Sequence, residues 1–338
     1  MAKGYSSITP KGEIAKQYVI ENPKLASRTL ARMLKHDHPE LFKSIEDARG
    51  TVRSYRGNKG EQCREGMKQN RDTFRPNGKA GEVNLPAGRN TFKPPLQISG
   101  DRKILVIADC HVPYHDERAL EAAIRHGVKE GCEAVYLNGD VCDFYALSRF
   151  QKDRAERNLK REIDTTKEVL TEFARHFPER WFKQGNHDER WDNFLNQGEE
   201  GLSEFTEFQL ETVLKLKETG YTHILSKQWA EMNGLSVIHG HEFQAGISAP
   251  VNPARGLWLK VSETAMCGHL HKSSYHPTKL SLSGSLVACW SLGCTCYLHP
   301  KYAVLNGWTQ GWAIVELSGK KKFQVSNYQF HDGEVYRG

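Results

Sequence analysis

The sequence lacks any apolar run approaching the roughly 20 residues that a membrane-spanning helix needs, so no transmembrane segment is predicted. The stretch from Met1 to Pro10 also lacks the apolar core of a secretory signal peptide. We therefore expect a cytoplasmic protein without a membrane partner. What is present is ordinary for a folded globular chain: 38% hydrophobic and 26% charged residues in 338 positions, enough for one large domain or two.

Paired C-x-x-C spacings, typical of structural zinc sites, are also absent among the eight cysteines. The cysteines are scattered, and several fall inside apolar, strand-like runs, which favours buried reduced thiols over a disulfide framework. Cys294 and Cys296 form a C-x-C pair. We do not expect this pair to bind metal.

Positive charge is concentrated at the beginning of the chain. Residues 1–100 hold 19 Lys and Arg against 10 Asp and Glu, whereas residues 101–338 hold 28 against 31. A basic segment joined to a slightly acidic body predicts two units, the first of which has a polyanionic partner.

Residues 1–60 are predicted to form three short helices. Apolar residues recur at helical spacing over 14–19, over 25–34 and over 41–55, and the third helix is expected to begin near Pro39. Proline suits a first helical turn, because the backbone N–H that it lacks has no partner there.

Four basic residues cluster toward the end of the third predicted helix: Arg49, Arg53, Arg56 and Lys59. The arrangement resembles a helix-turn-helix unit, whose basic helix lies in a major groove of DNA. We predict nucleic-acid binding through residues 1–60. The alternative is a basic face that docks a protein or the second unit of this chain.

Residues 61–100 are rich in Gly, Pro, Asn and charge and show little periodicity, as is typical of a flexible linker. From 101 to 338, strand-like apolar runs alternate with amphipathic helices, which predicts an α/β layered domain. The predicted strands lie at 103–111, 133–140, 180–188, 234–241, 264–271, 311–317 and 323–330, and the predicted helices at 116–131 and 152–176.

Polar side chains follow five of these strands at the point where each strand ends. They are Asp109 and His111, Asp140 and Asp143, Asn186 and His187, His239 and His241, and His269 and His271. Because ligands of α/β sheets bind beyond the carboxyl ends of strands, we expect these side chains to form one site. Imidazole, carboxylate and amide groups suit divalent zinc, manganese or iron. They are too many for one tetrahedral ion, which predicts two ions that share a carboxylate.

These five motifs, in this order, resemble the motif set of the calcineurin-like metallophosphoesterases. The matching segments are D-C-H (109–111), G-D-V-C-D (139–143), G-N-H-D (185–188), H-G-H (239–241) and G-H-L-H (268–271). The resemblance implies that residues 101–338 form a two-sheet αββα sandwich that hydrolyses phosphate esters with two divalent ions. The ions would be Mn, Fe, Zn or Ni, with Mn expected to support activity in vitro. A hydroxide held between the ions would attack phosphorus.

The resemblance also implies roles for single residues. The first ion would be held by Asp109, His111 and His271, the second by Asn186, His239 and His269, and Asp140 would bridge both. His187 would donate a proton to the leaving oxygen or stabilise it, and Asp143 would orient His187. Two alternatives stay open: His241 could replace His239 as the ligand, and Asp143 could be only a turn or cap residue.

Two departures from the protein phosphatases of this superfamily bear on the substrate. Phe144 stands where they carry a phosphate-gripping arginine, and Asp188 stands where they carry glutamate. Arg149, Arg154 and Arg190 could contact phosphate, but their spacing does not place them. We therefore predict hydrolysis of nucleic-acid or nucleotide phosphodiesters. The alternatives are a phosphomonoesterase, protein phosphatase or cyclic-nucleotide hydrolase, and a DNA-binding regulator with a low-activity metal domain.

Overall fold

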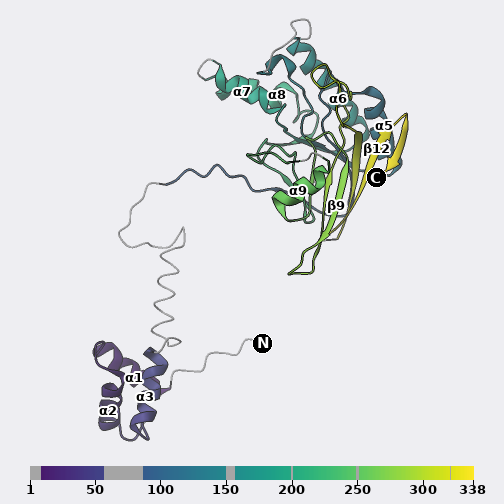
Figure 1. The fold of residues 1–338 in the computed structure, drawn as a ribbon. Coiled ribbons are helices and arrows are strands. Elements are labelled where there is room, and N and C mark those ends of the chain that lie inside the picture. The colour runs from purple at the N-terminus through teal and green to yellow at the C-terminus, as the bar shows by residue number, and fades with distance from the viewer. Residues whose placement is uncertain (1–8, 57–86, 150–156, 199–200, 249–250, 320) are drawn as a thin grey trace. The chain divides into compact units, whose positions relative to one another are not determined.

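The computed structural model of the chain describes residues 9–56, 87–149, 157–198, 201–248, 251–319 and 321–338. It divides into two compact units, Met1–Asn90 and Thr91–Gly338 (Figure 1). Most of the linker that we predict at 61–100 lies outside the described residues. Within the described ranges, no helix has both the length and the apolarity needed to cross a membrane.

The first unit contains the helices α1 (Pro10–Glu21), α2 (Ser27–Asp37) and α3 (Ile45–Arg56). Buried residues of these helices and Phe42, which lies between α2 and α3, form one small core: Ala15, Val19, Leu30, Ala31, Leu34, Phe42, Ala48, Val52 and Tyr55. The prediction that the third helix begins near Pro39 is wrong. The helix begins after Ser44, whose hydroxyl accepts the backbone N–H of Asp47 at 3.1 Å and so caps the first turn. The sequence predicts three helices here, and three are present among the described residues.

The second unit contains two mixed β-sheets. The seven-stranded sheet has the order β13 (Glu334–Arg337), β12 (Lys322–His331), β11 (Gln310–Ser318), β2 (Arg102–Ile107), β3 (Ala134–Asn138), β4 (Glu179–Lys183) and β5 (Tyr221–Ile224). The six-stranded sheet has the order β1 (Leu96–Ile98), β6 (Ala230–Met232), β7 (Leu235–Val237), β8 (Ala265–Cys267), β10 (Leu286–Ser291) and β9 (Ser274–Lys279).

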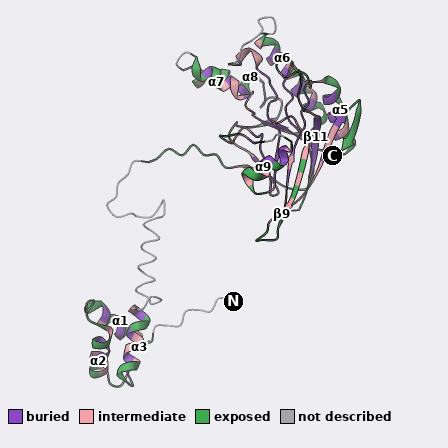
Figure 2. Ribbon diagram, viewed as in Figure 1, coloured by how far each residue is buried: buried purple, intermediate pink, exposed green. Residues whose placement is uncertain are grey.

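Alternation along the strands builds the layers, because successive side chains point to opposite faces of a sheet. On β2, Leu105 and Ile107 pack with the helices α5 (Glu117–Lys129) and α6 (Leu159–His176). Ile104 and Val106 face the other way and pack with residues of the six-stranded sheet. The helix α9 (Pro253–Val261) packs on the outer face of that second sheet. Purple buried segments run through these layers in Figure 2. The predicted αββα sandwich is confirmed.

Every strand that we predict has a counterpart in the two sheets. The predicted strand at 180–188 is shorter than expected: it ends at Lys183, and the helix α7 (Glu189–Gln197) follows. The predicted helix at 152–176 appears as α6 from Leu159 onward, and residues 152–156 lie outside the described part of the chain. The remaining short elements are α8 (Leu210–Val213) and the 3₁₀ turns Tyr145–Leu147, Leu202–Glu204 and Thr206–Phe208.

Candidate metal centre

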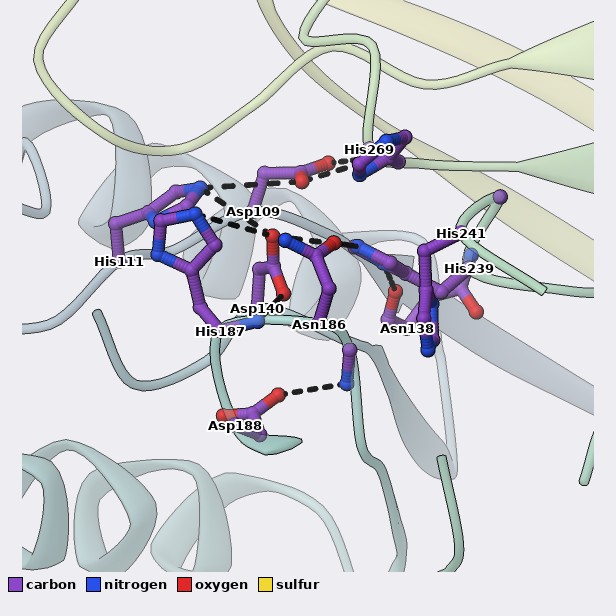
Figure 3. A network of polar contacts seen from close by, with 12 residues as sticks. Asp109, His111, Asn138, Asp140, Asn186, His187, Asp188, His239, His241 and His269 are labelled. Carbon is purple, nitrogen blue, oxygen red and sulfur yellow. Dashed lines mark hydrogen bonds and ion pairs between the residues drawn. The ribbon is translucent and has the colours of Figure 1, made fainter. Parts of the chain in front are cut away.

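The predicted ligands follow strands of both sheets. Asp109 follows β2, Asp140 follows β3 and Asn186 follows β4, and these three strands are parallel neighbours. His239 and His269 follow β7 and β8, which are parallel neighbours in the other sheet. Figure 3 shows these side chains gathered in one place. The carboxyl ends of two groups of parallel strands therefore supply one site.

Asp140 lies between the other polar groups. Its Oδ2 is 3.3 Å from His239 Nε2, 3.8 Å from His111 Nε2 and 4.0 Å from His187 Nε2. Its Oδ1 accepts the backbone N–H of His187 at 2.8 Å. Burial would raise the pKa of Asp140, but the positive charges of His239 and His187 lower it well below its ordinary value. The ionised carboxylate of Asp140 thus faces imidazole nitrogens from two groups of predicted metal ligands.

The first group contains Asp109, His111 and His271. His271 Nε2 is 3.2 Å from Asp109 Oδ1 and 3.0 Å from His111 Nε2. Two imidazole nitrogens at that separation cannot both carry protons without repulsion, whereas a cation attracts the lone pairs of both. All three residues are at least nine-tenths buried. This donor set fits a divalent metal ion.

The second group contains Asn186, His239 and His269. His239 Nε2 lies 3.2 Å from Asn186 Oδ1. One ligand atom each from Asp140, His239 and His269 lie within 4.8 Å of one another. Amide oxygen, carboxylate and imidazole are again the chemistry that divalent ions accept.

Backbone strain marks the same residues. Five of the seven predicted ligands adopt φ values between 50° and 68° although none is glycine: Asp109, His111, Asp140, His269 and His271. Such left-handed conformations cost roughly 1–3 kcal/mol each and persist where the surrounding structure enforces them, as at functional sites. The loops therefore hold these side chains at a cost to stability.

Two motif glycines allow the loops to approach closely. A Cβ atom on Gly185 would lie 2.2 Å from Asp140 Oδ1. A Cβ atom on Gly139, whose φ is 87°, would lie 2.4 Å from His239 Nδ1. Any side chain at either position would displace a predicted ligand.

Buried acceptors fix the orientation of His239. Its Nδ1 donates to the carbonyl of Asn138 at 2.7 Å, which leaves Nε2 available for metal. Its backbone N–H donates to Glu242 at 2.9 Å, and the same carboxylate pairs with buried Lys183 at 3.2 Å. Burial would raise the pKa of Glu242, but the charges of Lys183 and nearby histidines lower it to about 2.

His241 points to different neighbours. Its Nε2 lies 2.9 Å from the hydroxyl of Ser226. Burial and the charge of His239 lower its pKa to about 3. The group around Asp140 contains His239 and not His241. Of the two alternatives that the sequence leaves open, the geometry favours His239.

Asp143 contacts two histidines with one oxygen. Its Oδ1 accepts from His187 Nδ1 at 3.0 Å and from His111 Nδ1 at 2.9 Å. Burial acts to lower the pKa of His187, but the carboxylates of Asp140 and Asp143 raise it above its ordinary value. The sequence motif indicates the contact with His187. Nothing in the spacing indicates the contact with His111.

Arg190, on α7, adds a positive charge beside His187. Its Nη1 donates to the carbonyl of Asp143 at 2.8 Å, and its Nη2 lies 3.1 Å from His187 Nε2. Sequence spacing alone could not place this residue. Of the two other arginines considered with it, Arg149 is exposed and Arg154 lies outside the described residues.

The two positions that differ from protein phosphatases are both buried. Phe144 packs into the core, with its ring 5.7 Å from that of Trp191. The Asp188 carboxylate accepts the backbone N–H groups of Cys142 and Gly185, each at 2.8 Å, and so ties two motif loops together. Burial and the charge of Asp140 raise the pKa of Asp188 to about 6.

Cys294 and Cys296 lie next to the first ligand group. Their sulfur atoms and a ring nitrogen of His271 are all within 4.8 Å of one another, and both cysteines are buried and free. The loop between β10 and β11 brings the two thiols next to His271. The C-x-C spacing alone does not predict this contact.

The four basic residues predicted to contact nucleic acid have different environments. Arg53 is exposed on α3, and Arg49 pairs with Glu46 at 3.2 Å. The guanidinium of Arg56 donates to three backbone carbonyls of the turn between α1 and α2. Lys59 lies outside the described residues. A contact between Arg56 and nucleic acid would have to compete with these internal hydrogen bonds.

Three known proteins are similar to parts of this chain. Gene 54 protein of Mycobacterium phage L5 is 24% identical to this chain over 232 residues, which cover 65% of the chain and 90% of the relative. Among solved structures, vacuolar protein sorting 29 from Cryptosporidium parvum matches with a TM-score of 0.41 at 13% identity, over 70% of this chain and 96% of that one. Yfce, a phosphoesterase from E. coli, matches with a TM-score of 0.33 at 14% identity, over 69% of this chain and 96% of that one.

The family model described as calcineurin-like phosphoesterase matches residues 102–273, which span all five motifs and more than half of the chain. This match and the two-sheet sandwich assign the family. The chain belongs to the calcineurin-like phosphoesterases.

Proposed function

We propose that this protein is a dinuclear-metal-dependent phosphoesterase that hydrolyses phosphodiesters of nucleic acids or nucleotides. The observation that carries the proposal is the position of Asp140. Its Oδ2 faces His239 on one side, at 3.3 Å, and His111 on the other, at 3.8 Å. A single carboxylate between two complete donor sets suits a pair of ions roughly 3.5–4 Å apart, a recurring arrangement in phosphoryl hydrolysis.

The first ion would be held by Asp109, His111 and His271, the second by Asn186, His239 and His269, and Asp140 would bridge them. When bound, divalent ions such as Mn²⁺, Fe²⁺, Zn²⁺ or Ni²⁺ would activate water and neutralise charge on the phosphate.

His187 would hold the proton that the leaving oxygen takes up. Asp143 accepts the Nδ1 proton of His187 at 3.0 Å, so the ring presents Nε2 to the substrate. In the structure His187 Nε2 accepts from Arg190 Nη2 at 3.1 Å, because a guanidinium only donates. When Nε2 carries the proton for the leaving oxygen, Arg190 would donate to a phosphate oxygen instead. Arg190 would therefore bind phosphate in place of the arginine that protein phosphatases carry at the position of Phe144.

Two features favour a nucleic-acid or nucleotide diester. Phe144 is buried and contributes no charge to the site, which does not favour phosphoproteins. We propose that residues 1–60 are a basic, helix-turn-helix-like unit and that a linker at 61–100 joins it to a catalytic domain at 101–338. The end of that linker also contributes the strand β1 (Leu96–Ile98), which pairs with β6 of the second unit. Exposed basic residues on the helices of residues 1–60, such as Arg28, Arg32 and Arg53, would contact phosphates.

The experiment is hydrolysis of bis(4-nitrophenyl) phosphate by the purified full chain with Mn²⁺. We expect activity that Asp140→Asn abolishes while the circular dichroism spectrum stays unchanged. Asp164→Asn serves as the matched control and should retain full activity, because Asp164 lies on α6, its side chain is 46% exposed and it pairs with Lys160. Equal activity of Asp140→Asn and the unmodified protein would refute the assigned centre. A panel with monoesters, cyclic nucleotides, DNA and RNA then separates the substrate classes.

A further inference from the structure

The loop between β10 and β11, residues 292–309, exposes apolar side chains close to the metal centre. Tyr302 is 73% exposed, Val304 57% and Leu305 97%. Single exposed apolar residues are common, but three within four positions beside a polar site indicate a surface that meets a ligand.

Hydrogen bonds join this loop directly to the metal centre. The backbone N–H of Thr309 donates to the carbonyl of His271 at 2.8 Å, and the hydroxyl of Thr309 accepts the N–H of Ser273 at 2.7 Å. Within the loop, Asn306 Nδ2 donates to the carbonyl of Ala303 at 2.7 Å. The loop is therefore held in a defined conformation next to a predicted ligand.

Two aromatic rings extend outward from His271. The ring of Trp308 lies 4.1 Å from the imidazole of His271, at an interplanar angle of 65°. The ring of Tyr302 lies 6.3 Å from that of Trp308, at 63°. Both contacts lie within or near the range of favourable edge-to-face pairs. The two rings, in edge-to-face contact, thus lead from a predicted metal ligand to the exposed side chain of Tyr302.

The phenol of Tyr302 also lies within electrostatic reach of the catalytic groups. Partial burial and then the carboxylate of Asp143 raise its pKa above the ordinary value, Asp140 adds to this, and Arg190 opposes it. Tyr302 therefore lies near enough to Asp143, Asp140 and Arg190 for their charges to affect it.

We propose that Tyr302 and Trp308 form a stacking platform for the nucleobase attached to the scissile phosphate. This inference rests on the proposed function and specifies its substrate: a nucleotide whose base is unpaired. Every base has an aromatic face, so stacking on these rings would bind nucleotides with little sequence preference. Bases within a duplex are already stacked on their neighbours, so double-stranded substrates would not gain from the platform.

Two synthetic diesters with the same leaving group test the proposal: thymidine 5′-(4-nitrophenyl phosphate) and methyl 4-nitrophenyl phosphate. The readout is the ratio of their kcat/KM values for the Mn²⁺-loaded full chain. We expect a ratio of about 5 to 100 in favour of the nucleoside ester, the contribution of one stacked base. Tyr302→Ala should lower this ratio several-fold through a higher KM for the thymidine ester, and Tyr302→Phe should preserve it.

Tyr297→Ala is the matched control, because Tyr297 is an exposed aromatic residue of the same loop whose hydroxyl pairs with Glu117 instead. This variant should leave the ratio unchanged. A ratio near one in the unmodified protein, or an equal loss for both esters in Tyr302→Ala, would overturn the platform. Failure to hydrolyse either ester would instead overturn the proposed function, so the two failures are distinguishable.

Discussion

Replacing Asp143 with asparagine tests how the centre is organised. The Asp143 carboxylate uses one oxygen for two contacts, at 2.9 Å to His111 Nδ1 and at 3.0 Å to His187 Nδ1. Asparagine retains one acceptor oxygen but carries no negative charge, and its amide NH₂ cannot accept a hydrogen bond from either imidazole. Asp143→Asn should therefore weaken two hydrogen bonds at once: the one that orients His111, a predicted metal ligand, and the one that orients His187, the proposed proton donor.

The two effects have separate magnitudes. Loss of the hydrogen-bond acceptor that orients a metal-binding histidine weakens metal affinity by about 10- to 100-fold. Loss of general-acid catalysis lowers kcat by about 10²- to 10⁴-fold. The second effect depends on the substrate, because a poor leaving group needs the proton of His187 more than a good one does.

The assay compares diphenyl phosphate with bis(4-nitrophenyl) phosphate at saturating Mn²⁺, so that metal affinity does not contribute. We expect Asp143→Asn to slow hydrolysis of diphenyl phosphate strongly and hydrolysis of the nitrophenyl ester much less. The double variant with His187→Ala should be no slower than His187→Ala alone, since Asp143 would act through His187. Equal losses for both esters, or additive losses in the double variant, would refute this reasoning.

Four further outcomes are expected. Glu242→Gln should lower the free energy of unfolding in urea by about 3 kcal/mol near pH 7, because it leaves a buried lysine unpaired. The pKa of Glu242 is lowered from 4.5 to about 2, so its stabilising effect is present above pH 4.5 and is lost as pH falls toward 2. The difference in unfolding free energy between Glu242→Gln and the unmodified protein should therefore shrink as pH falls from 4.5 to 2. His239→Ala should abolish binding of one Mn²⁺ in calorimetric titrations, whereas His241→Ala should retain both ions, and the reverse result would exchange their roles. Arg190→Ala should lower kcat/KM for diesters by about 10- to 100-fold and weaken inhibition by inorganic phosphate, and unchanged phosphate inhibition would remove it from the binding site. Deletion of residues 1–60 should weaken DNA binding in fluorescence anisotropy while turnover of a small diester persists, and absence of DNA binding by the full chain at low salt would exclude the helix-turn-helix interpretation.

The sequence predicts the layered fold and the residues of the centre for the same physical reason. Ligand side chains such as Asp109 and Asp140 stand directly after apolar strands, and parallel strands bring their carboxyl ends to one edge of a sheet. Six strands of the structure are not predicted: β1, β5, β6, β9, β10 and β13. Of these, β1 and β6 have three residues each, which carry too little alternation to be recognised, and β9 contains a proline, which argues against a strand. The predicted start of α3 near Pro39 is wrong, because proline suits a first helical turn by its residue type, whereas in the structure the hydroxyl of Ser44 caps the helix.

Contacts between distant segments could not be predicted. The second histidine partner of Asp143 depends on two loops meeting 32 positions apart, and Arg190 reaches the site only because α7 begins immediately after the third motif. Trp308 lies against His271 through the fold of the loop between β10 and β11. None of these contacts leaves a periodic pattern in the sequence, because tertiary packing creates them.

The number of metal ions per chain tests the central claim most directly. Protein freed of metal by chelation, dialysed against Mn²⁺ and analysed by plasma mass spectrometry should contain two ions per chain. Asp140→Asn should contain at most one under the same conditions, with its fold retained. A single ion in the unmodified protein, or two ions in Asp140→Asn, would contradict a dinuclear centre bridged by Asp140.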